Sequence, residues 1–143
     1  MRRTYIDNVF EYYKEKDEGQ PFPVQGLYLR RLLVVDDEAS IRNMYKTIFS
    51  RRGFDVLTAG SAMEAKDLLV REHVDIVFLD INMVEVEGDT LFELIRAFHP
   101  NVKVVVSSVY PLDEQRERVR DANAYFDKSD SQDSLLKIVS TLI

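Results

Sequence analysis

The chain has 143 residues, of which 45% are hydrophobic, so it can bury one sizeable core but is too short for two ordinary domains. Its formal net charge of −6 excludes the basic footprint of a general nucleic-acid binder. Because the sequence contains no cysteine, disulfides and thiolate metal sites are excluded, which fits a reducing cytosol.

The first thirty residues differ in pattern from the rest of the chain. Apolar residues recur at helical spacing in TYIDNVFEYYKEKDEG, so this segment is predicted to be an amphipathic helix. Prolines and glycines in GQPFPVQG, residues 19–26, then indicate a linker. We therefore divide the chain into residues 1–26 and a domain at residues 27–143. The N-terminal helix could dock on its own domain, pair two protomers, bind a separate partner, or stay a loosely ordered tail.

Charged residues interrupt the apolar residues of the N-terminus. Asp7, Glu11 and Lys14 leave no uninterrupted apolar core of the kind that a signal peptide has. No apolar run approaches the roughly 20 residues that a membrane helix needs. We therefore expect a soluble, cytoplasmic protein without membrane insertion.

From Leu27 onward, short apolar strands alternate with helical patterns. In chain order, we predict strands at 32–35, 54–59, 74–80, 102–108 and 124–126, and helices at 38–53, 61–72, 89–100, 111–123 and 131–143. The run VDIVFLD at 74–80 is the most continuous apolar stretch, which is typical of a central strand covered on both faces. Five strands alternating with five helices predict an α/β domain, doubly wound around a parallel sheet.

Two of the predicted helices carry clear local signals. The helix at 38–53 has one apolar face and a glycine, Gly53, suited to end it. That face is predicted to be Ile41, Met44, Tyr45, Ile48 and Phe49. Ser61 and Glu64 form a capping-box pattern at the start of the next helix.

The fourth helix is predicted to be short, polar and weakly anchored. PLDEQRERVRDAN supplies only Leu112, Val119 and Ala122 to a core. Its arginines, Arg116, Arg118 and Arg120, are expected on a solvated face with the neighbouring acids Asp113, Glu114 and Glu117.

Polar residues follow four of the predicted strands. Asp36 and Asp37 end the first strand, Asp80 ends the third, Ser107 and Ser108 end the fourth, and Lys128 follows the fifth. Ligands of open parallel sheets bind outside the carboxyl ends of the strands, so these side chains are expected to share one crevice. Alone, the Asp36–Asp37 pair fits a helix N-cap equally well; the joint pattern is what favours a site.

The charges of this crevice favour a divalent cation. Three carboxylates and one lysine leave a net charge of −2, and crowded carboxylates raise the pKa of one another. A shell of oxygen ligands without thiol or imidazole suits Mg²⁺, with Mn²⁺ as the other option. Mg²⁺ bound by few carboxylates is typical of phosphoryl chemistry.

At these residues the sequence resembles the response-regulator receiver domain of two-component signal transduction, in its single-domain form. The motifs LLVVDDE, IVFLDINM…G, VVVSS and AYFDK occur in the family's order, and the resemblance covers residues 31–143. It implies a flavodoxin-like (βα)5 fold with strand order 2-1-3-4-5, here with an N-terminal helical extension.

The resemblance also implies a role for each matching residue. It makes Asp80 the phosphoacceptor, and Lys128 and the Ser108 hydroxyl the groups that bond the phosphoryl oxygens. Ser108 and Tyr125 match the switch hydroxyl and the switch aromatic. The implied metal ligands are Asp36, Asp37, Asp80 and the backbone carbonyl of Asn82. On pattern alone, Tyr125 fits a half-buried aromatic of the last strand better than it fits a switch residue.

The chain departs from the family pattern at several points. Val84 and Ser129 stand where the family usually has proline, and Val109 stands where it usually has alanine and could restrict access to the site. The span from Ser108 to Lys128 is about two residues shorter than usual, which we place in or before the fourth helix. Ser107 competes with Ser108 for the switch role, and the spacing from Asp80 favours Ser108.

The resemblance implies a phosphoacceptor signalling protein rather than an enzyme that acts on other substrates. A histidine kinase or phosphotransfer protein would phosphorylate Asp80 with Mg²⁺, and the chain would catalyse only this transfer and its autodephosphorylation. We expect no output domain in the chain and no direct contact with nucleic acid. A downstream protein target would therefore recognise the phosphorylated form, and the chain could also form a homodimer. The alternatives are an Mg²⁺-dependent phosphohydrolase with a phosphoaspartate intermediate and a phosphorylation-independent scaffold.

Overall fold

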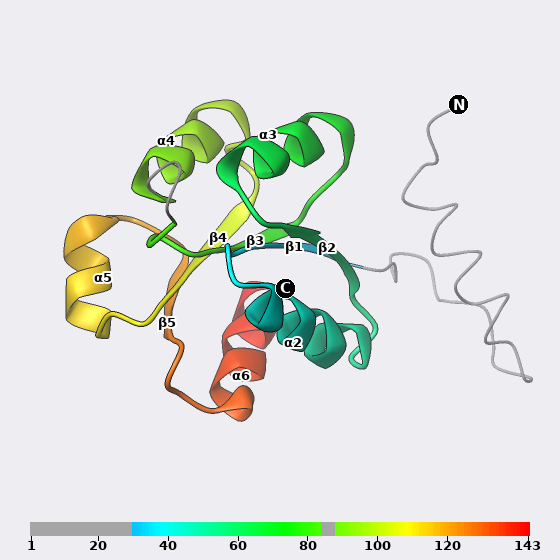
Figure 1. Cartoon of the computed structure of the whole chain (residues 1–143), viewed down its shortest axis with the longest axis vertical. Coiled ribbons are helices and arrows are strands. Elements are labelled where there is room, and N and C mark those ends of the chain that lie inside the picture. The colour runs from blue at the N-terminus through cyan, green and yellow to red at the C-terminus, as the bar shows by residue number, and fades with distance from the viewer. Residues whose placement is uncertain (1–29, 84–87) are drawn as a thin grey trace, which may run out of the picture.

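Five parallel strands form one sheet in the order β2-β1-β3-β4-β5 (Figure 1). The structure is a computed structural model, and it describes residues 30–83 and 88–143. The strands are β1 (Arg31–Val35), β2 (Asp55–Ala59), β3 (Ile76–Leu79), β4 (Lys103–Ser108) and β5 (Ala124–Asp127). The α/β class, the parallel pairing and the strand order are therefore confirmed. The predicted N-terminal helix and linker at residues 1–26 lie outside the described residues, as does Val84.

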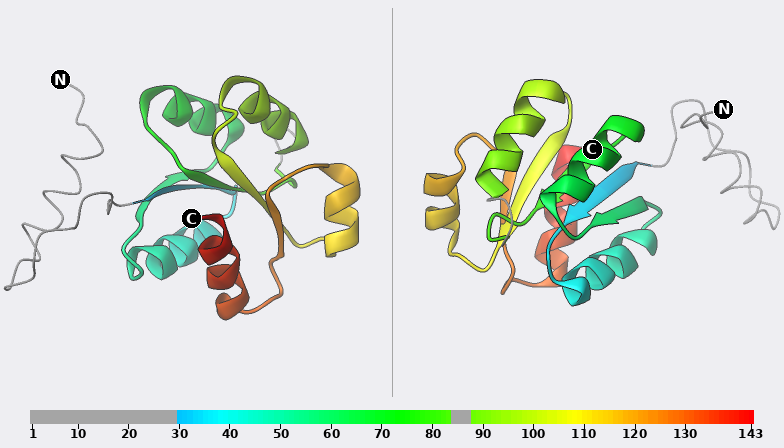
Figure 2. Two further views of the ribbon diagram at one scale, coloured as in Figure 1. Left: turned by 180° about the vertical axis from the view of Figure 1, so that it is seen from behind. Right: turned by 45° about the horizontal axis from the view of Figure 1, so that its top comes forward.

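Helices cover both faces of the sheet. They are α2 (Ala39–Ser50), α3 (Ala62–Arg71), α4 (Gly88–Phe98), α5 (Leu112–Arg118) and α6 (Gln132–Leu142). Figure 1 and the two views of Figure 2 show α3 and α4 on one face, α2 and α6 on the other, and α5 beside β5. Within the described part of the chain, no helix has the length and apolar character needed to cross a membrane.

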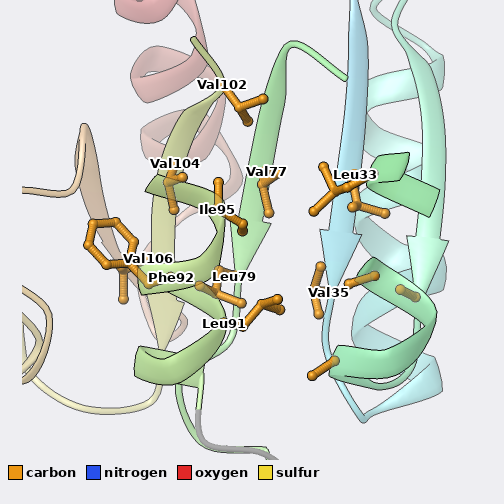
Figure 3. Close-up of a cluster of buried hydrophobic side chains, with 14 of the residues drawn as sticks. Leu33, Val35, Val77, Leu79, Leu91, Phe92, Ile95, Val102, Val104 and Val106 are labelled. Atoms are coloured by element: carbon orange, nitrogen blue, oxygen red, sulfur yellow. The ribbon is translucent and has the colours of Figure 1, made fainter. Parts of the chain in front are cut away.

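Two apolar clusters, one on each side of the sheet, make up the core. The α3/α4 side holds every second residue of the central strands, such as Leu33, Val77 and Val104 (Figure 3). The α2/α6 side holds the residues between them, among them Val34 and Phe78. Because side chains alternate along a strand, covering both faces requires an uninterrupted apolar run, as the sequence of β3 has.

The local signals of α2 and α3 are mostly confirmed. Tyr45, Ile48 and Phe49 are buried, and the chain turns at Gly53 with φ of 88° soon after α2 ends. The prediction that Met44 faces the core is wrong, since 47% of it is exposed. Met44 lies roughly a quarter turn from the middle of the buried stripe and so falls at its edge.

The capping box of α3 is present. The Ser61 hydroxyl accepts a hydrogen bond from the Glu64 N–H at 3.2 Å. The Glu64 carboxylate reaches back to the Gly60 N–H at 2.9 Å, one residue before the usual partner in this motif. The bond from the Glu64 N–H satisfies a backbone donor that the helix itself leaves unpaired, and the bond from the Gly60 N–H ties the preceding residue to the first turn.

The short fourth helix, α5, differs from its prediction in the residue that it buries. Val119 is buried and Ala122 half-buried, but Leu112 is 37% exposed, so its predicted place in the core is wrong. The side chain that enters the interior is Gln115, which is 0% exposed. The arginines are exposed as predicted, and two of them also stack on aromatic rings. These contacts are Arg116 over Tyr125 at 5.4 Å and Arg118 over Tyr110 at 5.0 Å.

Phe78 provides a test of the core on the α2/α6 side. It is 0% exposed, and its ring centroid lies 5.7 Å from that of Tyr45 and 5.1 Å from that of Phe49. We expect Phe78→Ala to lower the free energy of unfolding by about 3–5 kcal/mol, measured by urea unfolding, because it leaves a cavity. Met63→Ala, at a position 78% exposed, is the control and should change it little. Equal effects of the two substitutions would contradict this packing.

Candidate functional site

Two buried aspartates stand side by side at the carboxyl ends of β1 and β3. The Asp36 N–H donates to Ala59 O at 3.1 Å and the Asp80 N–H donates to Val35 O at 2.9 Å, so the sheet bonding continues into both residues. Asp36 is 2% and Asp80 4% exposed. The sheet itself therefore fixes both carboxylates next to each other.

Asp37 completes an acidic cluster at the surface. Oxygen atoms of Asp36, Asp37 and Asp80 lie within 4.8 Å of one another, and of these three only Asp37 is exposed. The predicted convergence of the three acids is therefore present. One exposed carboxylate beside two buried ones gives the cluster an open side toward solvent.

Lys128 supplies the positive charge of the site. Its ammonium lies 2.6 Å from an Asp36 carboxylate oxygen and 3.3 Å from an Asp80 oxygen, and its side chain is 9% exposed. The Lys128 N–H donates to Ser108 O at 2.8 Å, so the pairing of β5 with β4 sets the position of the lysine. Lys128 thus reaches the acids from the end of β5, the strand at one edge of the sheet.

The buried charges perturb one another. Burial raises the pKa of the Asp80 carboxyl, and the nearby Asp36 charge adds to this, while the Asn82 N–H and Lys128 oppose it without cancelling it. Burial alone would lower the pKa of Lys128, but the hydrogen bond to Asp36 and the charges of Asp80 and Asp36 outweigh it and raise that pKa. Lys128 is therefore a permanent cation at neutral pH.

Backbone donors hold the two buried carboxylates in place. The Asn82 N–H donates to Asp80 Oδ1 at 2.9 Å, and the Glu38 N–H donates to Asp36 Oδ1 at 2.9 Å. Both bonds join residues two apart, which is the geometry of an Asx turn. Asn82 thus lies next to Asp80 as predicted, and the role of its backbone carbonyl as a metal ligand stays a prediction.

A cleft of about 410 Å³ opens over this cluster, and its lining residues are Asp37, Glu38, Asp80, Asn82, Met83, Val109 and Lys128. Val109 is 63% exposed and stands at the cleft, where we predicted that it narrows the access. Glu38 and Met83 also line the cleft and were not among the predicted site residues. Glu38 had a signal, since it is the third acid of the DDE run.

The two serines of β4 point to different partners. The Ser107 hydroxyl is 2.9 Å from the Tyr45 hydroxyl of α2, and both residues are buried. The Ser108 hydroxyl accepts from the Tyr110 N–H at 3.1 Å. Neither serine lines the cleft. Because Ser107 is engaged on the α2 side, the geometry favours Ser108 for the switch role, which stays a prediction.

Tyr125 is half-buried and lies against α5 rather than against the acids. Its hydroxyl donates to Val119 O at 2.6 Å and accepts from the Ala122 N–H at 3.2 Å. Its ring packs against the apolar cluster of the α3/α4 side. The structural contacts of Tyr125 thus link β5 to the end of α5, and its role as a switch aromatic stays a prediction.

The donor set fits a hard divalent cation. Three carboxylates and Lys128 leave a net charge of −2, and all available ligand atoms are oxygens. Mg²⁺ takes a small number of carboxylates and keeps waters on its open side, which matches one exposed and two buried acids. Zn²⁺ prefers imidazole or thiolate ligands, and no cysteine is available.

Comparison with known proteins decides the family. The model of the response regulator receiver domain matches residues 32–140. The chain belongs to this family. The match spans all the strand ends that carry the site described above.

Relatives of known structure and name agree with this assignment. The response regulator TrrA of Thermotoga maritima, solved in complex with Mg²⁺-BeF, is 30% identical, with a TM-score of 0.75 over 80% of this chain and 100% of that one. Sporulation initiation phosphotransferase F of Bacillus subtilis is 25% identical over 56% of this chain and 64% of its own length. Regulatory protein AtoC of Escherichia coli is 32% identical over 57% of this chain and 18% of its own. The chain therefore matches less than two thirds of either curated relative.

The raised pKa of Asp80 predicts a dependence of stability on pH. A carboxyl whose pKa is raised by folding binds its proton more tightly in the folded than in the unfolded protein. Its contribution to stability is therefore most favourable at a pH below its ordinary pKa of about 4, and is lost as the pH rises through the raised pKa of the folded state. In the presence of a chelator, Asp80→Asn should therefore raise the free energy of unfolding at pH 7, and the difference should shrink toward pH 3.5.

Urea unfolding at both pH values measures this difference. Asp113→Asn, at an exposed aspartate of α5, is the control and should change stability little at either pH. A wild-type protein at least as stable as the Asp80 variant at pH 7 would contradict the description of Asp80 as a buried carboxylate with a raised pKa.

Proposed function

We propose that this chain is a phosphoacceptor signalling protein that receives a phosphoryl group on Asp80 from a histidine kinase or a phosphotransfer protein. The observation that carries the proposal is the Lys128 ammonium shared between Asp36 and Asp80, beside an exposed third acid. This arrangement holds a nucleophilic carboxylate and a fixed cation at the floor of one open cleft. The name of the phosphotransferase from Bacillus subtilis supports a role in phosphotransfer.

The proposed transfer requires positioning more than covalent chemistry. An oxygen of Asp80 bonds to phosphorus as the bond from phosphorus to the donor histidine nitrogen breaks, and that nitrogen keeps the electron pair. Asn82 orients the other Asp80 oxygen through its N–H. Lys128 offsets the additional negative charge of the acyl phosphate, and its burial strengthens this interaction.

We assign the metal of this reaction as Mg²⁺, held by Asp36, Asp37, Asp80 and the carbonyl of Asn82. When bound, Mg²⁺ supplies positive charge to the phosphoryl oxygens. The acidic cluster and the Mg²⁺-BeF complex of the similar protein TrrA support this assignment. We propose no turnover of separate substrates; the chain would catalyse only its own phosphorylation and dephosphorylation. A cytoplasmic location is part of this proposal.

The surface that changes on phosphorylation is proposed to be that of α5 and β5. The helix has 7 residues, and within it only Gln115 is buried; its Nε2 donates to Tyr110 O at 2.8 Å and to Phe126 O at 3.0 Å. The Gln115 Oε1 atom is buried and has no hydrogen-bond partner among the described residues. A short helix with a partly satisfied buried anchor opens at low cost, which suits a segment that a downstream protein reads.

Phosphorylation of Asp80 is tested with acetyl phosphate and Mg²⁺. We expect the wild-type protein to gain one phosphoryl group by mass spectrometry and Asp80→Asn to gain none, because the attacking carboxylate is gone. Asp113→Asn, whose side chain is fully exposed, should be labelled like the wild type. Retained labelling of the Asp80 variant would contradict the assignment, and steady release of phosphate from small esters would favour the phosphohydrolase.

Movement of α5 is tested by hydrogen exchange with and without beryllofluoride in Mg²⁺. We expect the exchange rates of residues 112–126 to change, while those of β1 and β3 stay the same, because the central strands are buried on both faces. Gln115→Leu should raise exchange in α5 even without the ligand, since it removes the bonds to Tyr110 and Phe126. A response confined to the residues around Asp80 would contradict the proposed surface.

A further inference from the structure

A buried pair of hydroxyls lies directly beside the site and has no part in the function described so far. Tyr45 of α2 and Ser107 of β4 are separated by 62 residues, and their hydroxyl oxygens are 2.9 Å apart. Each residue is 2% exposed. The bond therefore joins a helix on the α2/α6 side to the carboxyl end of β4, away from solvent competition.

The Tyr45 side of this bond is rigid. Its ring meets Phe49 and Phe78 edge-on, with centroids 6.2 Å and 5.7 Å away, and it belongs to the apolar cluster of the α2/α6 side. Burial raises the pKa of the Tyr45 phenol above its ordinary value, so the hydroxyl keeps its proton at neutral pH. The charges of Lys128, Asp36 and Asp80 also act on it, which places the hydroxyl within the electric field of the site.

The Ser107 side of the bond is next to the groups that must act on a phosphoryl group. Ser108 follows immediately, and its carbonyl accepts the Lys128 N–H at 2.8 Å. The Ser108 hydroxyl lies on the opposite face of β4, where it accepts from the Tyr110 N–H. Fixing Ser107 therefore fixes the strand end from which both Ser108 and Lys128 are positioned.

We propose that Tyr45, through Ser107, is a positioning residue for phosphoryl binding: it fixes the end of β4 so that Ser108 and Lys128 meet the phosphoryl oxygens. The inference rests on the proposed function of Asp80. Ser108 can then exchange its bond with Tyr110 for one with the phosphoryl group while the strand beneath it stays in place. Tyr45 itself touches no reacting atom.

The test compares Tyr45→Phe, Ser107→Ala and the double variant. Either single change leaves one buried hydroxyl without a partner, which lowers stability, whereas removing both hydroxyls restores most of it. Affinity for beryllofluoride at saturating Mg²⁺, measured by calorimetry, should fall about fivefold in each single variant, the effect of one ordinary hydrogen bond. It should stay reduced in the double variant, because the strand end remains unfixed.

Two measurements separate positioning from a merely structural role. Mg²⁺ affinity without beryllofluoride should equal that of the wild type in all three variants, since the acids follow β1 and β3. Thr47→Val removes an exposed hydroxyl of the same helix that bonds Asn43 O, and it should change neither affinity.

Several outcomes would overturn the inference. Unchanged beryllofluoride affinity in Tyr45→Phe would do so, as would affinity that recovers together with stability in the double variant. If only Asp80→Asn loses labelling while the Tyr45 variants behave as wild type, the proposed function stands and this inference fails. If the wild type neither binds beryllofluoride nor is labelled, both fail.

Discussion

A buried lysine ammonium that bridges two buried carboxylates is the interaction on which the arrangement of the site depends. Lys128 contacts Asp36 at 2.6 Å and Asp80 at 3.3 Å, and none of the three side chains is more than 9% exposed. Removing such charges from water is expensive, and their mutual attraction offsets the cost only when the geometry is good. One cation for two carboxylates still leaves an excess of negative charge. Lys128 thus offsets enough of the negative charge for both carboxylates to be buried, and the remaining negative charge favours the binding of a further cation.

The sheet explains how these three groups meet although they lie far apart in the sequence. Because β1 and β3 are neighbours, the residues that follow them are neighbours too, and the sheet brings Asp36 and Asp80 side by side. Lys128 follows β5, which pairs with β4, and the Lys128 N–H donates a hydrogen bond to Ser108 O. The apolar strands therefore act as rigid supports that set carboxylates against an ammonium. A shift of β5 by one residue along β4 would turn the lysine away from the acids.

The sequence predicted those parts of the site that depend on strand ends and alternation. The acids, the lysine and the strand order follow from where apolar runs stop and from the family pattern, and all of them lie where expected. The apolar pattern predicted burial less well for residues at the edge of a buried helix face: Met44 and Leu112 were expected in the core but are exposed. The Tyr45–Ser107 bond could not be predicted, because a tyrosine on an apolar helix face looks like any core aromatic. Gln115 was missed for the opposite reason, since a glutamine in a polar helix looks solvated.

The buried serines and the buried glutamine of the described residues lie on the side of the site formed by β4 and α5. The cores behind Asp36 and Asp80 are apolar on both faces of the sheet, whereas the end of β4 and α5 bury Ser107, Ser108 and Gln115. Apolar contacts are non-directional and resist displacement through packing alone, but a buried hydrogen bond is either made or broken. An element held by such bonds has a few discrete positions rather than a continuous range. Packing therefore holds the strands behind Asp36 and Asp80, and the Tyr45–Ser107 bond holds the end of β4. The Ser108 hydroxyl and α5 are then the parts that would change in the proposed response to phosphorylation.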